Sequence, residues 1–436
     1  MSSASEGTVA DARAMADSPP TAIMVGIFLA AYLSWRPSID IMFTVSDLCL
    51  LIGGAQLLVR KHIPLEPFGL LSPLWFAAFA LMMGGLLVSS LFCHDPTRWI
   101  IVALQYSVAW AVLPFLLMGH GAANTNRLAC ALLFGVFLME LIGIIVYFTY
   151  SGSFEDARAT LGLDFLSGSG RLGAFATDAN WNGATISMAL PFAFYLRARR
   201  VIGLWQMLVI AGVLFYALLL SASATAFGSM VVAILFFVLF GDRRIRAYVL
   251  GGLVGIVALG IVLNAVNVTL PAVFQKRVAN ALEAGDIAEA GTFEDRLGLA
   301  KDAWQRVGDH MFVGVGVDQD RVISPAGAPV HNMYLLLWVE GGFLTLVGWI
   351  AMIGVGGVIG FTALKRDRLA GALALSVLAT FLLFSAASPH MYARLWAVPV
   401  LLALAIALHG GEADLRRRSG RALSSRRMRA LRHARG

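Results

Sequence analysis

The sequence predicts an all-α, polytopic membrane protein with about 12 transmembrane helices. The first observation is composition: 59% of the 436 residues are hydrophobic and only 14% are charged, whereas soluble proteins are roughly half apolar and about a quarter charged. The second is a mean hydropathy of +0.78. The third is the recurrence of apolar runs near the roughly 20 residues that a helix needs to cross a membrane. An ordinary soluble domain is therefore excluded.

Apolar runs separated by charged, polar or proline-containing segments give the predicted spans. They lie near residues 21–35, 39–59, 68–92, 99–118, 128–150, 179–196, 202–220, 223–240, 247–268, 342–364, 369–388 and 395–409. Residues 21–268 would therefore hold transmembrane helices 1–9, and residues 342–409 would hold helices 10–12.

Both terminal segments are predicted to be tails. Residues 1–20 lack the basic start of a signal peptide and are expected to form a disordered cytoplasmic tail. Residues 410–436 form an arginine-rich tail, which supplies much of the net charge of +7. In so apolar a chain, such a tail indicates anionic membrane lipids as partners and argues against nucleic acid.

The distribution of Lys and Arg predicts that both termini are cytoplasmic. Basic residues in short loops resist translocation across the membrane. With the amino terminus inside, the inside tail and short inside loops hold 13 Lys and Arg, and the outside, apart from its longest loop, holds five. An even number of spans follows.

Two predicted outside segments are longer than the roughly 4–6 residues of most connections. Residues 151–178 precede the sixth span, and residues 269–341 separate the ninth span from the tenth. The larger segment includes a helical pattern over 294–307 with one apolar face. This face comprises Leu297, Ala300, Trp304 and Val307. We expect helices of this kind to lie at the membrane interface, and the function to reside in the two segments.

Residues 331–342, HNMYLLLWVEGG, hold a candidate general base. On a helix, four of these residues would share a face: His331, Tyr334, Leu335 and Trp338. Histidine accepts a proton near neutral pH, which makes His331 the candidate. A His and Trp pair in the interfacial aromatic belt, with no ligand, is the alternative.

Residues 168–183, GSGRLGAFATDANWNG, are the candidate for anion binding. They bring polar side chains to the outer mouth of the sixth span, namely Arg171, Asp178, Asn180 and Asn182. An arginine flanked by glycines could donate two hydrogen bonds to a phosphate or a carboxylate. A flexible turn whose arginine extends to the interface is the alternative.

Other charged residues carry less specific signals. Arg277 and Arg296 offer further cations in the large loop, although neighbouring carboxylates could pair with them. Asp318 and Asp320 form a DxD pattern, which holds a divalent metal in some soluble enzymes. Two aspartates at this spacing are common by chance, so we interpret them as part of a turn.

Three carboxylates lie within predicted spans: Asp40 near the outer end of its span, and Asp47 and Glu140 deeper. Ionisable residues there are functional candidates by default. Because no further ionisable cluster continues a proton path from them, we favour pairing with polar groups inside the bundle.

Together these features resemble the bacterial O-antigen ligases and polymerases. The common features are twelve spans, a large outer loop between the ninth and tenth, an arginine-bearing loop before the sixth, and an HN-x-Y-L stretch. The family's order of arginine, tryptophan, G-x-G and H-N also occurs. The matching residues are Arg296, Trp304, Gly314, Gly316, His331 and Asn332. The resemblance covers most of the chain and is strongest over about residues 168–348.

The resemblance implies a metal-independent, inverting glycosyltransferase of the bacterial inner membrane that uses no cofactor. It would move a glycan from an undecaprenyl-diphosphate carrier to an acceptor hydroxyl at the periplasmic face. A ligase would use the lipid A core as acceptor, and a polymerase would use a growing glycan. We favour the ligase, on the compact HN-x-Y-L stretch and the modest length of the chain.

The resemblance also implies roles for individual residues. His331 is the expected base, and Arg171, Arg296 and Arg277 are the expected diphosphate ligands. The expected supporting residues are Asn332, Glu340, Asn180 and Tyr334.

The chain departs from the family at one position. Many members carry an S-x-S-R element between the seventh and eighth spans, whereas this chain has Ser221, Ser223 and then Ala224. Another arginine would have to supply the missing cation.

A transporter or flippase for a lipid-linked glycan is the competing class. Such proteins usually have repeat symmetry and broken helices near the membrane midplane. No pair of repeated halves is evident, and the polar residues gather at the outer face instead. A non-enzymatic scaffold would leave the histidine and the outward arginines without a role.

Overall fold

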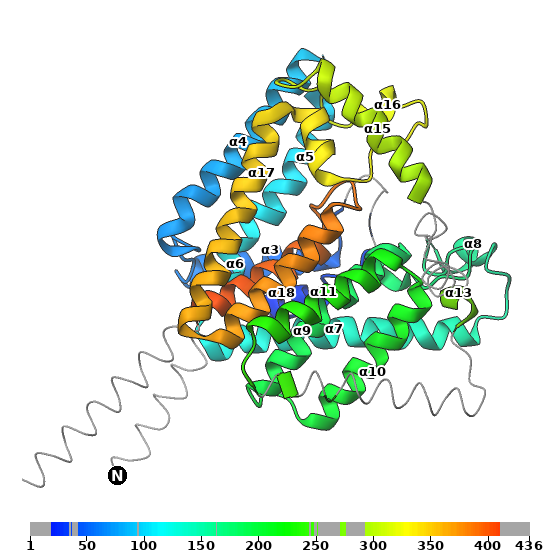
Figure 1. Ribbon diagram of the computed structural model, residues 1–436. Helices are drawn as coiled ribbons and strands as arrows, with labels where there is room; N and C mark the ends of the chain where they lie inside the picture. Colours follow the sequence, from blue (N-terminus) through cyan, green and yellow to red (C-terminus); the bar gives the residue numbers. More distant parts are fainter. Residues whose placement is uncertain are drawn as a thin grey trace, which may run out of the picture.

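A computed structural model gives the arrangement of the chain, which is nearly all helical (Figure 1). The described residues are 19–34, 36, 42–93, 96–162, 164–243, 246, 247, 251, 271–275 and 293–409. Over these ranges there is no β-strand, and the only β-type pairing is an isolated bridge between Leu166 and Leu172.

The first part of the chain forms helices that end before the first long loop. They are α2 (Thr21–Phe28), α3 (Val45–Val59), the short η1 (Gly69–Leu71), α4 (Ser72–Phe92), α5 (Pro96–Tyr106), the π-helical segment η2 (Ser107–Val112), α6 (Leu113–Leu117) and α7 (Ala122–Thr149).

The remaining elements include the two helices that carry the candidate site. They are α8 (Ala157–Leu161), η3 (Ala174–Ala176), α9 (Ala179–Ala198), α10 (Leu204–Ser221), α11 (Ala224–Phe240), α13 (Ala272–Phe274), α15 (Phe293–Asp309), α16 (Asp320–Ile323), α17 (Met333–Arg366) and α18 (Arg368–Ser385), followed by an apolar helix over Arg394–His409.

Six helical stretches in the described part of the chain are long and apolar enough to cross a membrane. They are Gly69–Phe92, Pro96–Leu117, Ala122–Thr149, Leu204–Ser221, Met333–Arg366 and Arg368–Ser385. Shorter apolar helices cover Val45–Val59, Ala224–Phe240 and Arg394–His409. The prediction of a multi-helix membrane protein is confirmed, whereas the number of 12 spans is not.

The predicted spans differ from the helices in three places. The run at 21–35 forms only the eight residues of α2, because the chain turns after Phe28. The span at 342–364 begins earlier, at Met333. The helix α9 is long, yet its polar residues keep it out of the set of candidate spans. The predicted span at 247–268 and both tails, apart from single residues, lie outside the described part of the chain.

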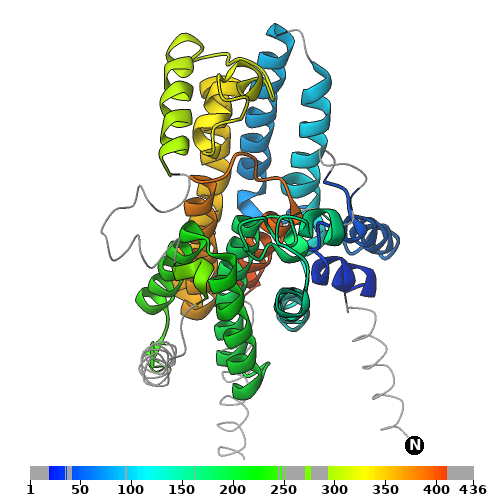
Figure 2. The same ribbon diagram turned by 90° about the vertical axis from the view of Figure 1, so that its right-hand side faces the viewer.

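Helices α4, α5 and α17 run side by side, with α15 and α16 beside the start of α17 (Figures 1 and 2). Helix α17 packs along α4, and α18 packs against α9, α11 and α17. Helices α9, α10 and α11 form the green group in the lower half of Figure 1.

Loops that the sequence predicts on one side of the membrane meet in the structure. Arg199, after α9, pairs with Asp367, between α17 and α18. At the opposite ends of α9 and α17 lie Asp178 and His331, which interact electrostatically. We call the second group of loops the His331 end. The meeting of these loops agrees with the predicted alternation of the helices.

Candidate functional site

His331 directly precedes α17, and its neighbour Asn332 begins the helix. The Asn332 Oδ1 accepts hydrogen bonds from the backbone amides of Tyr334 and Leu335, both at 3.1 Å. Such an N-cap satisfies amides that have no partner within the helix. His331 therefore does not lie on a helical face with Tyr334 and Trp338, as the spacing predicted. It lies on the fixed segment that leads into the helix.

The ring of His331 is held in one tautomer by the backbone. Its Nδ1 lies 3.1 Å from the carbonyl oxygen of Pro329. A carbonyl oxygen can only accept, so Nδ1 carries the proton and donates it. The Nε2 of the neutral ring then has its lone pair available, as a general base requires.

Charges from two other elements act on His331. Burial lowers the pKa of His331 below its usual value, and the cation of Arg296 on α15 lowers it further. The Pro329 carbonyl and the carboxylate of Asp178, which begins α9, act in the opposite direction. The structure therefore brings α15, the start of α9 and the start of α17 together. Two predicted site residues, His331 and Arg296, meet there.

Arg171 lies against the turn between α10 and α11. Its Nε donates to the carbonyl oxygen of Ser221 at 2.8 Å, and its Nη2 donates to Asn180 Oδ1 at 2.7 Å. The hydroxyl of Ser223 donates to the same Asn180 oxygen at 3.0 Å. The Arg171 guanidinium thus lies at the turn where Ala224 stands in place of an arginine, and Asn180 orients it.

The start of α9 is fixed from both sides. Asp178 caps the helix by accepting from the amides of Asn180 and Trp181, at 2.8 and 2.9 Å. The Trp181 ring packs edge-on against Trp396, with centroids 5.9 Å apart. Because Asp178 acts on His331 and Asn180 holds Arg171, this one helix end connects the predicted base to the predicted anion ligand.

A buried polar pair supports the Arg171 loop from within the bundle. Asn182 Nδ2 donates to Glu140 Oε2 at 3.1 Å and to the carbonyl oxygen of Leu172 at 3.3 Å. Asp47 is also paired, with Arg394 at 2.7 Å. The two deeper carboxylates therefore contact polar partners inside the protein, as we favoured from the sequence, and Asp40 lies outside the described residues.

Helix α15 carries Arg296 and packs on α17 with part of its predicted apolar face, through Ala300 and Val307. Ala303 and Val307 are buried, whereas Leu297 and Trp304 are 46% and 62% exposed. The Trp304 ring instead meets Trp338 of α17, with centroids 5.8 Å apart. The small side chains of Ala303 and Val307 allow the two helices to approach closely. The larger Trp304 side chain is therefore not buried between them.

An ion pair joins α15 to the segment before His331. Arg306 Nη2 lies 2.7 Å from Oδ1 of the fully buried Asp320, and the other oxygen of Asp320 accepts from the amide of Val330 at 2.8 Å. Asp318 pairs with Arg98 and Arg321. The aspartates of the DxD pattern thus bind arginines and backbone within a turn, as interpreted from the sequence.

Two predicted supporting residues lie away from His331. Tyr334 donates its hydroxyl hydrogen to the carbonyl oxygen of Leu382 in α18 at 3.0 Å. Glu340 is buried in α17 against the backbone of Asp318 and Asp320. Both residues hold helices and loops together. Arg277 lies outside the described residues.

The sequence reasoning missed a second histidine at this end. His390 lies in the connection of residues 386–393, with Nδ1 3.5 Å from the hydroxyl of Tyr106. The same hydroxyl lies 3.5 Å from the sulfur of Met333, two residues after His331. The polar run SPHMYAR between two apolar helices was the available signal. Across the described ranges, no three His, Cys, Asp or Glu side chains gather as metal ligands.

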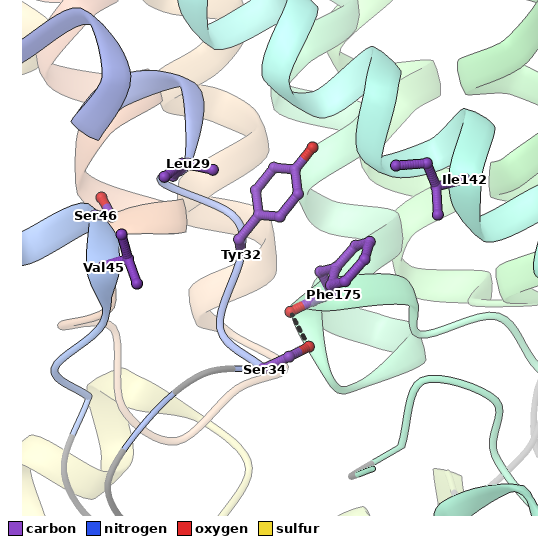
Figure 3. Close-up of a pocket in the computed structure, with 7 residues that line it drawn as sticks. All are labelled: Leu29, Tyr32, Ser34, Val45, Ser46, Ile142 and Phe175. Carbon is purple, nitrogen blue, oxygen red and sulfur yellow. Dashed lines mark hydrogen bonds between the residues drawn. The ribbon is translucent and has the colours of Figure 1, made fainter. Parts of the chain in front are cut away.

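An apolar cavity of about 250 Å³ lies beside the loop that carries Arg171 and Asp178 (Figure 3). It is lined by Leu29, Tyr32, Ser34, Val45, Ser46, Ile142 and Phe175. Ser34 donates to the carbonyl oxygen of Phe175 at 3.3 Å, which ties the chain after α2 to η3. This lining suits a hydrocarbon group.

Comparison with known proteins assigns the part of the chain that contains His331. Residues 209–350 match the family model described as O-antigen ligase. This segment, about a third of the chain, is similar to the O-antigen ligase family. No curated protein matches the chain. The resemblance inferred from the sequence is confirmed, and the chain is a multi-pass bacterial membrane protein with a domain of a glycan-transfer family.

The O-antigen ligase domain holds some of the site residues and lacks others. Arg296 and His331 lie inside it, as does the Ser221–Ala224 turn. Arg171 and Asn180 precede it and His390 follows it. The complete site is therefore assembled from the domain and from the helices on either side of it.

Proposed function

We propose that the protein is an O-antigen ligase that transfers a glycan from undecaprenyl diphosphate to a hydroxyl of the lipid A core. The observation that carries this proposal is the convergence of His331, Arg296 and Asp178, in a chain whose residues 209–350 match the O-antigen ligase family. A polymerase would use the same donor and residues with a growing glycan as acceptor.

In the proposed reaction, His331 is the general base. An acceptor hydroxyl becomes an effective nucleophile when a base removes its proton in the transition state. The proton passes to Nε2 of His331, the acceptor oxygen bonds to the anomeric carbon, and the bond from that carbon to the diphosphate breaks. Attack on the face opposite the leaving group inverts the anomeric configuration. The donated hydrogen bond from Nδ1 to Pro329 supports this role.

The arginines would neutralise the departing diphosphate. Negative charge develops on the leaving oxygen, and guanidinium groups donate paired hydrogen bonds to phosphate oxygens. Arg171 is held at the Ser221–Ala224 turn by Asn180, and Arg296 approaches His331 from α15. Arg277 remains a third proposed ligand. Arginines in these positions fit a mechanism without a metal ion or a cofactor.

The membrane arrangement proposed from the sequence completes this picture. Both termini would be cytoplasmic in the inner membrane, the His331 end would be periplasmic, and the arginine-rich tail of residues 410–436 would contact anionic lipids. The cavity beside Phe175 offers an apolar surface for the isoprenoid chain close to Arg171.

The function is tested by the surface glycan of a strain that lacks the protein. A ligase predicts lipid A core without attached polymer, and a polymerase predicts single repeat units on the core. Purified protein in detergent should also form product from the two substrates. Detergent solution has no two compartments, so product there requires catalysis and would contradict a transporter. Unchanged glycan in the deletion strain would contradict the proposal.

A further inference from the structure

A second cationic group lies at the His331 end, on elements that the proposed donor site does not use. Arg98, in the first turn of α5, pairs with Oδ2 of Asp318, and Arg321 of α16 lies 2.7 Å from the same oxygen. Two guanidinium groups facing one carboxylate leave these three side chains with a net charge of +1. Their side chains are 25%, 44% and 13% exposed, in the order Arg98, Arg321 and Asp318.

The pairing leaves donors for a ligand. Each guanidinium has five N–H groups in a planar fork, and each pair with Asp318 uses one terminal nitrogen. The Nε of Arg98 is buried and has no hydrogen-bond partner in the described part of the chain. Asp318 itself adopts a left-handed backbone conformation, with φ of 64°, which is uncommon outside glycine and occurs at functional turns.

Aromatic rings adjoin this cationic group. Burial lowers the pKa of His390 to about 4, Asp318 acts against this, and the charges of Arg98 and Arg321 add to it. His390 is therefore neutral at pH 7 and lies within the electrostatic range of all three side chains. Tyr392 stacks on the His390 ring, with centroids 5.4 Å apart and an angle of 29°. By whole-residue exposure, His390 and Tyr392 are intermediate between buried and exposed.

The connection that carries these rings is held next to His331. Trp110, in the π-helical segment η2, donates its Nε1 hydrogen to the carbonyl oxygen of Met391 at 3.0 Å. Tyr106 lies between His390 and Met333. Such π-helical segments often occur at functional sites. In Figure 2 this connection crosses between the start of α17 and the green helices.

We propose that Arg98, Arg321, His390 and Tyr392 form the acceptor subsite, which binds an anionic sugar of the acceptor glycan through its phosphate or carboxylate. The inference rests on the proposed function and names its second substrate more closely. Arginine forks bind phosphate and carboxylate oxygens in pairs, and the stacked rings of His390 and Tyr392 adjoin the two arginines. The proposed donor arginines lie on α15 and in the loop before α9, whereas this subsite is built from α5, α16 and residues 386–393.

The test is equilibrium binding of mannose 6-phosphate to the full chain in phosphatidylcholine nanodiscs, measured by saturation-transfer NMR, with mannose as the uncharged reference. The wild type should bind the phosphate ester, and Arg98→Gln with Arg321→Gln should weaken this binding about tenfold or more. Arg199→Gln is the matched control. It breaks the Arg199–Asp367 pair, which lies at the end of α9 away from the His331 end. It should bind as the wild type does.

Binding to the Asp318→Asn variant distinguishes an anion-binding subsite from a cluster of arginines that only stabilises the fold. Asparagine tolerates the left-handed conformation, and the change raises the local charge from +1 to +2. The proposal therefore predicts tighter binding, whereas loss of a structural contact predicts weaker binding. If the double variant does not fold, binding can be measured on Asp318→Asn and on the single variant Arg321→Gln. The Arg321 side chain is exposed, so the single change should be tolerated.

Three results would overturn the proposal: equal binding of mannose and its phosphate, wild-type affinity in the double variant, or weaker binding in Asp318→Asn. Loss of binding when the nanodiscs contain phosphatidylglycerol would also overturn it, because the cluster would then bind lipid headgroups. His331→Ala should bind the probe about as well as the wild type. Binding is read without turnover, so failure of the proposed catalysis is distinguishable from failure of the subsite.

Discussion

His331 combines a fixed tautomer with a pKa that burial lowers and two opposite charges adjust. The Pro329 carbonyl fixes the proton on Nδ1, and Arg296 and Asp178 act on the ring with opposite signs. A base works only when unprotonated, so activity should fall as the pH falls through the pKa of His331. That pKa lies below the usual 6.5, so the ring is neutral at pH 7.

The pH profile of kcat/KM should therefore respond to both charged neighbours. Arg296→Gln removes a cation that lowers the pKa of His331, so the acid limb should move to higher pH. Asp178→Asn removes an anion that raises it, so the limb should move to lower pH. Asparagine keeps the N-cap of α9, which limits structural effects. Shifts of the same sign in both variants would contradict the role of His331 as the titrating base.

The residue types of the site could be predicted from the sequence better than their contacts. Arg171 and Asn180 were expected near one another and are hydrogen-bonded. Tyr334, expected on one face with His331, and Glu340, expected as a supporting residue from the resemblance, instead contact α18 and the Asp318 turn. His390 was missed, because its proximity to His331 depends on the packing of α5 between two segments that are distant in sequence.

At the scale of elements, one glycine shapes the start of α17. Gly342 has φ of 76° and ψ of −175° within the helix, and its backbone lies against Phe312. A Cβ at this position would overlap the Phe312 carbonyl oxygen. The interruption lets the chain after α15 pass close to α17, which positions the segment that ends at His331.

We predict that Gly342→Ala destabilises the protein by about 2–3 kcal/mol and lowers transfer activity. Gly354→Ala in the same helix is the control, because a Cβ there has open space around it. Thermal unfolding in detergent and the transfer assay would measure both effects. Equal stability of the two variants would show that the interruption at Gly342 imposes no constraint.

Element boundaries were predicted well where apolar runs end at strong caps, and poorly elsewhere. The start of α9 coincides with the predicted 179, because Asp178 caps it. The start of α17 at Met333 was not predicted as part of a span, because residues up to 341 were assigned to the large outer loop.

At the scale of the whole molecule, composition predicted the helical membrane class, whereas the number of 12 spans stays a prediction. The Arg199–Asp367 pair and the His331 end each join loops that were assigned to the same side. Apolar length overestimated the first span, because the chain turns after the eight residues of α2. The orientation of the whole bundle remains a prediction from basic residues.

The orientation predicts opposite labelling of two exposed positions. In a variant without Cys49, Cys93 and Cys130, a cysteine at Ala326 should react with an impermeant maleimide added to intact spheroplasts. A cysteine at Val201, which is 44% exposed near the other end of α9, should react only after the membrane is permeabilised. The reverse pattern would place His331 on the cytoplasmic side and contradict the proposed donor face.

The account depends most on His331 as a base that does not bind the donor. Donor affinity and single-turnover transfer should be measured on one preparation of His331→Ala, with His310→Ala, an exposed histidine at the end of α15, as the control. We predict donor affinity within about twofold of the wild type and a rate lower by about 10²–10⁴-fold. Transfer at the wild-type rate, or a loss explained entirely by weaker donor binding, would contradict the central claim.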